Sequence, residues 1–158
     1  MTGSFTHLDD AGHARMVDVS GKQPSVRSAT ARGFVSCPET VVAALRSGEV
    51  PKGDVLAVAR VAGIAAAKRT PDLLPLAHVI GVHGVSVDLA VTDTGVEIIA
   101  TVRTADRTGV EMEALTSVAV AALAVVDMVK GLDRRVAIGS IELVAKSGGR
   151  SGDWRRPD

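Results

Sequence analysis

The stretch from Val82 to Thr104, VHGVSVDLAVTDTGVEIIATVRT, decides the fold class. Apolar and polar residues alternate over 82–91 and again over 96–104, as expected of strands with one buried face. Between them, Thr92-Asp93-Thr94-Gly95 is a turn sequence, because Asp and Gly favour tight turns. The stretch therefore predicts a β-hairpin.

The flanking sequence extends this hairpin into a complete domain. Apolar residues at helical spacing predict helices, and alternating residues predict strands. The segment 70–78 contains Pro71 and Pro75 and is expected to be irregular, and 15–20 fits a short strand or an extended arm. The other expected elements are strands over 25–35 and 136–145 and helices over 38–48, 53–68 and 110–130.

The resulting order, β-α-α-β-β-α-β, is typical of an α+β, ferredoxin-like split βαβ fold, an antiparallel sheet with helices on one face. The other sheet face is expected to carry Val and Ile and to need cover, most simply from a second subunit. With 158 residues the chain suits one domain. We predict a mobile N-terminal tail over 1–14, a single catalytic domain over 15–153 and a C-terminal tail over 154–158.

Composition excludes several classes of protein. Lys plus Arg (18) balances Asp plus Glu (18), which disfavours general binding to nucleic acid or anionic membranes. Aromatic residues make up 2% of the chain, too few for base stacking. The single cysteine, Cys37, excludes an intrachain disulfide and a thiolate-rich zinc site.

Hydropathy predicts a cytoplasmic protein. The chain has no uninterrupted apolar run of ~18 residues, so no transmembrane helix is expected, and its polar start lacks the features of a signal peptide. The mean hydropathy of +0.25 is nevertheless high for a short chain. It indicates apolar surface hidden in an oligomer or, alternatively, a well-buried monomeric core.

Glu113, Asp127 and Lys130 are charged positions in the otherwise apolar helix expected over 110–130. Asp127 and Lys130 are spaced i, i+3 and should lie side by side, as a proton-transfer pair or as an ordinary ion pair on a solvated flank. Glu113 lies 14 residues before Asp127, close to four turns, and so shares its angular sector.

Scattered cations could build one polyphosphate pocket in this neutral chain. Lys52 lies at an expected helix start, where free N–H groups attract phosphate. The other cations considered for this pocket are Arg27, Lys68, Arg69, Lys130 and the tail residues Lys146 and Arg150. Solvated lysines and a flexible C-terminus are the alternative. His78 suits a hydrogen-bonding site or a structural position, and its spacing from His83 and Asp88 matches no metal-ligand pattern, so no metal site is expected.

Several sequence blocks occur together in an order that resembles a known family. They are MVDVS (16–20), KGDV (52–55), ARVAGI (59–64), AAKRT (66–70), PLAH (75–78), GVEMEALT (109–116) and KSGGRSG (146–152). Over about residues 6–153 the chain resembles the cyclic pyranopterin monophosphate synthase family, the molybdenum cofactor biosynthesis protein C family.

The resemblance implies a ferredoxin-like fold and a homo-hexamer built as a trimer of dimers, with each active site between subunits. It implies conversion of the cyclised dihydro-GTP (8S)-3',8-cyclo-7,8-dihydroguanosine 5'-triphosphate to cyclic pyranopterin monophosphate, with release of pyrophosphate. No redox cofactor is expected, and Mg²⁺ could accompany the substrate phosphates.

The resemblance also assigns residue roles. Asp127 and Lys130 match the catalytic acid–base pair, and Lys52 matches a second functional lysine. The expected substrate-binding residues are Leu76, Ala77, His78, Met112, Glu113, Arg27, Lys68 and Lys146. Ala77 and Val79 stand where the family usually has Cys and Pro, so no thiol chemistry is expected and a rigid turn beside His78 is lost.

Asp127 and Lys130 can perform the proton transfers if burial moves their pKa values toward neutrality. The Ala and Val around them disfavour an isolated charge, so the two residues should depend on each other. Two other functions stay open at the level of sequence. One is a non-catalytic nucleotide-binding module of the same fold. The other is an inactive homologue that acts by assembly with other chains, suggested by Ala77 and Val79.

Overall fold

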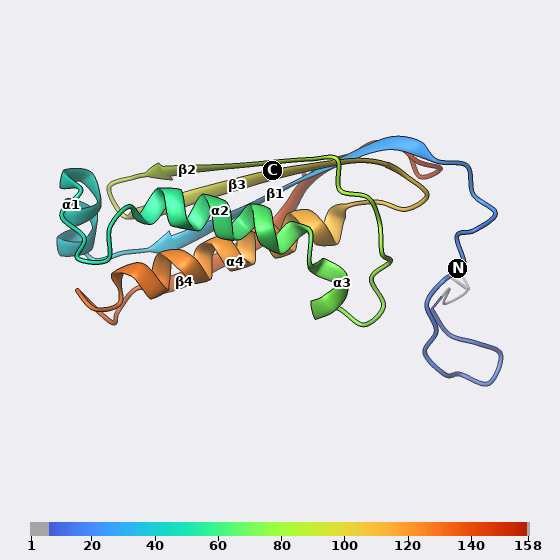
Figure 1. The fold of residues 1–158 in the computed structure, drawn as a ribbon, viewed down its shortest axis with the longest axis horizontal. Helices are drawn as coiled ribbons and strands as arrows, with labels where there is room; N and C mark the ends of the chain where they lie inside the picture. The colour runs from blue at the N-terminus through green and yellow to red at the C-terminus, as the bar shows by residue number, and fades with distance from the viewer. Residues whose placement is uncertain (1–6, 158) are drawn as a thin grey trace.

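The computed structural model describes residues 7–157, which form an antiparallel sheet covered by helices on one face (Figure 1). The sheet order is β2-β3-β1-β4-β5. The strands are β1 (Ser25–Ser36), β2 (Gly84–Val91), β3 (Gly95–Asp106), β4 (Ala137–Ser147) and β5 (Trp154–Arg155). The helices are α1 (Glu39–Ser47), α2 (Val55–Ala67), α3 (Thr70–Leu73) and α4 (Glu111–Val129). The α+β, ferredoxin-like prediction is confirmed.

The predicted hairpin is β2 and β3, which pair in antiparallel register from Gly84–Arg103 to Val91–Val96. Alternate residues of β3, among them Val96, Ile98 and Ala100, are fully buried under the helices. Burying such a Val or Ile side chain contributes about 1.5–3 kcal/mol. The alternation of apolar and polar residues therefore favours a strand and places its apolar face against the core.

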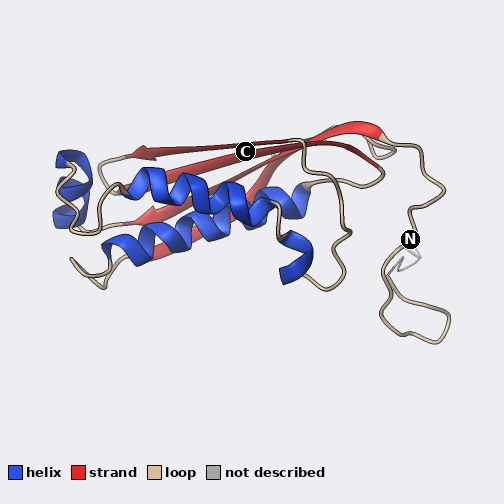
Figure 2. Cartoon of the chain, viewed as in Figure 1, coloured by secondary structure: helices blue, strands red, loops and turns tan. Residues whose placement is uncertain are grey.

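The core lies between the sheet and the two long helices, which Figure 2 shows together on one side of the strands. Alanine and glycine at the helix contacts let α2 and α4 pack closely. Helix α4 is long and apolar enough to span a membrane by length and composition, with a mean hydropathy of 1.8. Its buried residues, which include Val118, Ala121 and Val125, lie in the core, and this position accounts for its composition.

Two sequence expectations need correction. The segment predicted as irregular contains α3, because Pro71 occupies its first turn, where a missing N–H costs no hydrogen bond. The open sheet face is mixed rather than a surface of Val and Ile. It carries exposed Ile99, but also a bond between the Thr30 and Thr101 hydroxyls at 2.9 Å and the Arg32–Glu142 ion pair at 2.6 Å.

The described residues near both ends of the chain form a few backbone contacts. The segment 15–20 forms no strand and is the extended-arm alternative. Of the predicted N-terminal tail, residues 1–14, residues 1–6 lie outside the described residues. In the rest of this tail, Leu8 and Ala14 form an isolated β-bridge. The predicted C-terminal tail begins with β5, whose Trp154 pairs with Lys146 of β4.

Candidate active site

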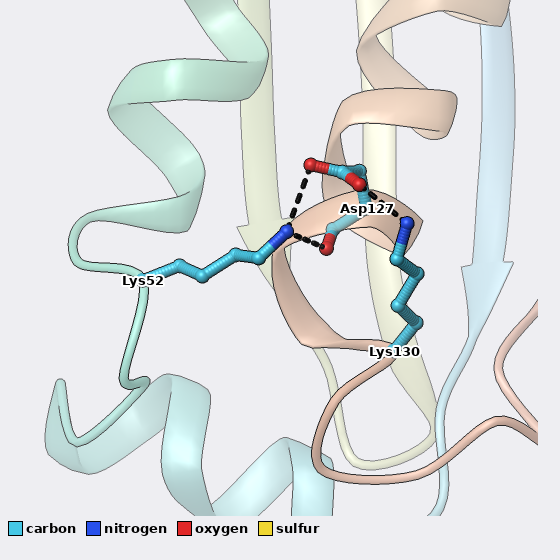
Figure 3. A network of polar contacts seen from close by, with 3 residues as sticks. All are labelled: Lys52, Asp127 and Lys130. Atoms are coloured by element: carbon cyan, nitrogen blue, oxygen red, sulfur yellow. Dashed lines mark hydrogen bonds and ion pairs between the residues drawn. The ribbon is translucent and has the colours of Figure 1, made fainter.

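The three residues predicted as catalytic meet at the C-terminal end of α4 (Figure 3). Lys130 Nζ donates to Asp127 Oδ1 at 2.6 Å, and Lys52 Nζ donates to Asp127 Oδ2 at 3.0 Å. One carboxylate therefore holds two ammonium groups, one on each oxygen, and the cluster keeps a net positive charge. We call these three residues the lysine–aspartate cluster.

Local structure explains why Lys52 reaches this cluster. Asp54 caps α2 by accepting the backbone N–H of Ala57 at 2.9 Å, which fixes the start of the helix two residues after Lys52. Lys52 Nζ also donates to the backbone carbonyl of Asp127 at 2.8 Å. Carbonyls in the last turn of a helix lack intrahelical partners and attract cations. The ammonium of Lys52 thus ties the α1–α2 loop to the end of α4.

The carboxyl of Asp127 is exposed to solvent and carries a negative charge. Its side chain is 57% exposed, and the hydrogen bonds from Lys130 and then Lys52 hold the pKa of its carboxyl below the ordinary value. Burial does not move this pKa toward neutrality within one chain, because the Asp127 side chain at the last turn of α4 is exposed. Asp127 is thus held as an anion that can accept a proton only from a strong donor.

A second group of predicted residues lies at the opposite end of the molecule, near α3 and the start of α4. His78 Nε2 lies 2.6 Å from the backbone carbonyl of Val17, so it donates this bond and the arm 15–20 holds the ring. Glu113, in the first turn of α4, is 3% exposed. Burial, which outweighs its other contacts, raises the pKa of this carboxyl. Glu113 is therefore the carboxyl disposed to keep a proton.

The chain neighbours of His78 and Glu113 line an apolar groove. Its lining includes Leu76, Ala77 and Met112, all predicted as substrate-binding, together with Ala14, Leu74 and Pro75. Met112 and Leu76 are 45% and 40% exposed, large values for apolar side chains. Leu76 and Ala77 of one predicted stretch and Met112 of the other thus line one groove, whereas His78 and Glu113 do not line it.

A basic groove lies at the same end and includes Arg27, at the start of β1. Its lining also contains Lys22, Arg150 and Ser151. Gly149 has φ +76°, and a Cβ there would lie 2.3 Å from a terminal nitrogen of Arg27. Glycine is therefore required where the Arg27 guanidinium crosses the C-terminal loop.

Sequence reasoning did not name Lys22, since a lone lysine between Gly21 and Gln23 carries no signal of its own. Its place in the basic groove follows only from the approach of the C-terminal loop to β1.

The last two predicted cations also lie at this end. Lys146 Nζ hydrogen-bonds to the Ser151 hydroxyl and so joins β4 to the C-terminal loop. Lys68 is the exposed C-cap residue of α2, where a cation suits the negative end of the helix dipole. Neither residue contacts the lysine–aspartate cluster in the part of the chain that the structure describes.

The predicted site residues therefore form two groups in one chain. Glu113 and Asp127 are 14 residues apart on α4, which places them about 21 Å apart along the helix axis. Figure 1 shows α1 and the end of α4 at one extremity, with α3 and the start of α4 at the opposite end of the helical layer. The predicted shared angular sector is compatible with this arrangement, but one small substrate cannot contact both groups of a single chain.

The structure offers no metal centre among residues 7–157. No three His, Cys, Asp or Glu side chains gather there in a way that could hold an ion. The His83 ring contacts the sheet instead: its Nδ1 accepts a hydrogen bond from the backbone N–H of Ala105 at 3.3 Å.

Comparison with known proteins identifies the family to which this chain belongs. The MoaC family matches residues 16–149. The chain belongs to the MoaC family. Its relatives include proteins named cyclic pyranopterin monophosphate synthase from Nocardioides sp. (61% identity, covering 97% of this chain and 96% of the relative) and Streptomyces coelicolor (61%, covering 96% and 89%). The Geobacter sulfurreducens protein of the same name is 54% identical and covers 98% of each chain.

Proposed function

We propose that this chain is a cyclic pyranopterin monophosphate synthase, which converts the cyclised dihydro-GTP to cyclic pyranopterin monophosphate and releases pyrophosphate. The observation that carries the proposal is the contact of Lys52 and Lys130 with opposite oxygens of Asp127. Lys52 and Asp127 are 75 residues apart in the sequence, so their contact depends on the fold, and it supports the proposed roles of the three residues.

The lysine–aspartate cluster suits repeated proton transfer. Opening and reclosing a purine-derived ring requires protons to be removed and returned at several positions. Asp127 stays anionic between two ammonium groups, so Lys52 or Lys130 can donate a proton to the substrate while the carboxylate offsets the remaining charge. Substrate that covers this exposed end would also exclude water and strengthen these interactions.

The opposite end suits recognition of the triphosphate and the ring. Lys22, Arg27 and Arg150 line the basic groove, and arginine and lysine are the usual partners of phosphate. Closing a cyclic phosphate with loss of pyrophosphate builds negative charge on the leaving group, which such cations stabilise. Glu113, next to Met112 in the first turn of α4, has a pKa raised by burial and suits the role of a proton donor.

The two groups work on one substrate if they come from different chains. We therefore propose a homo-hexamer, a trimer of dimers, in which the lysine–aspartate cluster of one subunit faces the grooves of its neighbour. The reaction rearranges bonds without net oxidation, so the proposal needs no redox cofactor. Any Mg²⁺ would be held mainly by the substrate phosphates. We place the protein in the cytoplasm.

A double-mutant cycle tests the catalytic role of the cluster. Purified wild-type chain given the cyclised dihydro-GTP should release pyrophosphate and form the cyclic product. Asp127→Asn and Lys130→Met should each lower kcat by about 10²–10⁴. The kcat of the double variant should be only a little lower than that of the less active single variant, because the effects of substitutions in groups that act as a unit are not additive.

Arg46 and Asp93 provide the matched control, since they form an exposed ion pair of the same 2.6 Å length that includes no residue of either group. Arg46→Met and Asp93→Asn should leave turnover unchanged. Full turnover in both cluster variants, with only a lower melting temperature, would make the cluster a structural ion pair. Tight binding of the substrate without pyrophosphate release by the wild type would favour a nucleotide-binding module or an inactive homologue.

A further inference from the structure

We infer that Asp106, the last residue of β3, is a positioning residue for the substrate end of the site: it fixes the His78 segment and Arg27 relative to each other. This inference rests on the proposed function. The segment from Leu74 to His83 forms neither helix nor strand, so its orientation depends on individual hydrogen bonds. Val79 in this segment is 88% exposed and contributes almost no packing.

The first role of Asp106 is to hold the His78 segment. Its Oδ2 accepts the backbone N–H of Gly81 at 3.1 Å. On the other side of the same residue, the buried Thr104 hydroxyl donates to the Gly81 carbonyl at 2.5 Å. Both polar groups of the Gly81 backbone are therefore bound to the end of β3, three residues from His78.

The second role of Asp106 is to hold Arg27. Its backbone carbonyl accepts Arg27 Nε at 3.0 Å, which leaves the terminal guanidinium nitrogens available at the basic groove. The neighbouring Arg107 donates through Nε to the carbonyl of Lys22 at 3.0 Å. The end of β3 thus fixes Lys22, Arg27 and Gly81, which come from three different segments.

The carboxylate of Asp106 also sets the conformation of its own backbone. Its Oδ1 accepts the backbone N–H of Arg107 at 2.7 Å. The two hydrogen bonds from the N–H groups of Arg107 and Gly81 hold the pKa of this carboxyl below its ordinary value. The side chain is therefore charged at neutral pH, and charged acceptors make stronger hydrogen bonds than neutral ones.

The role of Asp106 contrasts with that of Asp93. Asp93 lies in the turn at the opposite end of the same hairpin and pairs only with a side chain, that of Arg46. Removal of Asp93 should not disturb the substrate end, whereas removal of Asp106 should release Gly81 and loosen the carbonyl that holds Arg27. These two residues make a matched pair of variants.

The test compares Asp106→Ala, Asp106→Asn and Asp93→Ala in the full-length protein. Asp106→Ala should lower kcat/KM for the cyclised dihydro-GTP by about 10–100-fold, mainly through a higher KM, because a misplaced contact of about 1 Å costs up to this much. Asp106→Asn keeps one acceptor oxygen and should recover part of the loss. Asp93→Ala should match wild type.

Hydrogen–deuterium exchange of the peptide 77–83 supplies the second measurement. Asp106→Ala should speed exchange there while the remaining sheet exchanges as in wild type, and Asp106→Asn should be intermediate. Wild-type kcat/KM in Asp106→Ala, unchanged exchange over 77–83, or a loss explained entirely by unfolding would each overturn the inference. If wild type itself releases no pyrophosphate, the proposed function fails, and exchange over 77–83 alone decides whether Asp106 positions the segment.

Discussion

Glu113 and Asp127 lie on the same helix, yet their surroundings move the pKa values of their carboxyls in opposite directions. Glu113 is buried against the core, and removal from water raises its pKa. Asp127 is exposed between two lysines, and their hydrogen bonds lower its pKa. At the scale of single residues, Glu113 is thus the proton-holding carboxyl and Asp127 the anionic one.

The raised pKa of Glu113 makes stability depend on pH. A group whose pKa is higher in the folded state favours folding below its ordinary value, 4.5 here, and this contribution is lost as pH rises through the folded pKa. We expect Glu113→Gln to melt at a higher temperature than wild type at pH 7–8 and to lose that advantage near pH 4. Thermal unfolding followed by circular dichroism across this range measures the difference.

Glu97 supplies the control for this pH series, because its side chain is exposed on β3. Glu97→Gln should follow the wild-type curve at every pH. A Glu113→Gln variant that tracks wild type across the whole range would show that Glu113 is as well solvated in the folded protein as in the unfolded chain.

The contacts of single residues were predictable only where they are local. The Asp127–Lys130 pair follows from i, i+3 spacing on a helix, and the structure confirms it. The contact of Lys52 with Asp127 depends on how the α1–α2 loop meets the end of α4, which no local pattern records. The predicted shared sector of Glu113 and Asp127 rests only on their angular positions around the helix. It does not include the rise along the helix axis, which separates the two residues.

At the scale of elements, α2 and α4 are held together by a close approach at Gly63. A Cβ at this position would lie 3.0 Å from the backbone oxygen of Ser117 and 3.2 Å from Cβ of Ala121. The Ser117 hydroxyl is also buried here without a hydrogen-bond partner in the described chain. The helices therefore have no free space to accept a larger side chain.

We expect Gly63→Val to lower the free energy of unfolding by about 1–3 kcal/mol, the usual cost of overfilling a packed interface. Urea unfolding measures the change. Ala65→Val is the matched control, because Ala65 is exposed on the same helix, and it should cost only the small helix propensity of valine. Equal stability of the two variants would contradict tight packing at Gly63.

Most elements were predictable because their periods are clear. The hairpin and α4 have long, regular patterns, and the structure places them within two residues of the predicted bounds at each end. Helix α3 was missed because Pro71 was taken as a helix breaker, although proline is well tolerated in a first turn. The mixed open face of the sheet was missed because strand patterns alone do not show how polar residues of neighbouring strands pair.

At the scale of the whole molecule, apolar surface remains on the outer side of the helices and at the groove. Val61 and Leu123 are 66% and 57% exposed, more than expected of large apolar side chains in a monomer of this size. Such surface is available for contacts between subunits. Light scattering should give a mass near six times 16.2 kDa.

Assembly alone does not show that active sites are shared, but complementation between variants does. Lys52→Ala removes one member of the lysine–aspartate cluster, and His78→Ala alters the opposite end. If each site combines these ends from two subunits, a mixed dimer contains one doubly altered site and one intact site.

Co-expression of the two variants in equal amounts should then restore about one quarter of wild-type pyrophosphate release, as expected for random pairing of symmetric subunits. Each variant expressed alone should be nearly inactive. No recovery in mixed hexamers would mean that one chain supplies the whole site, although its two groups lie about 21 Å apart along α4.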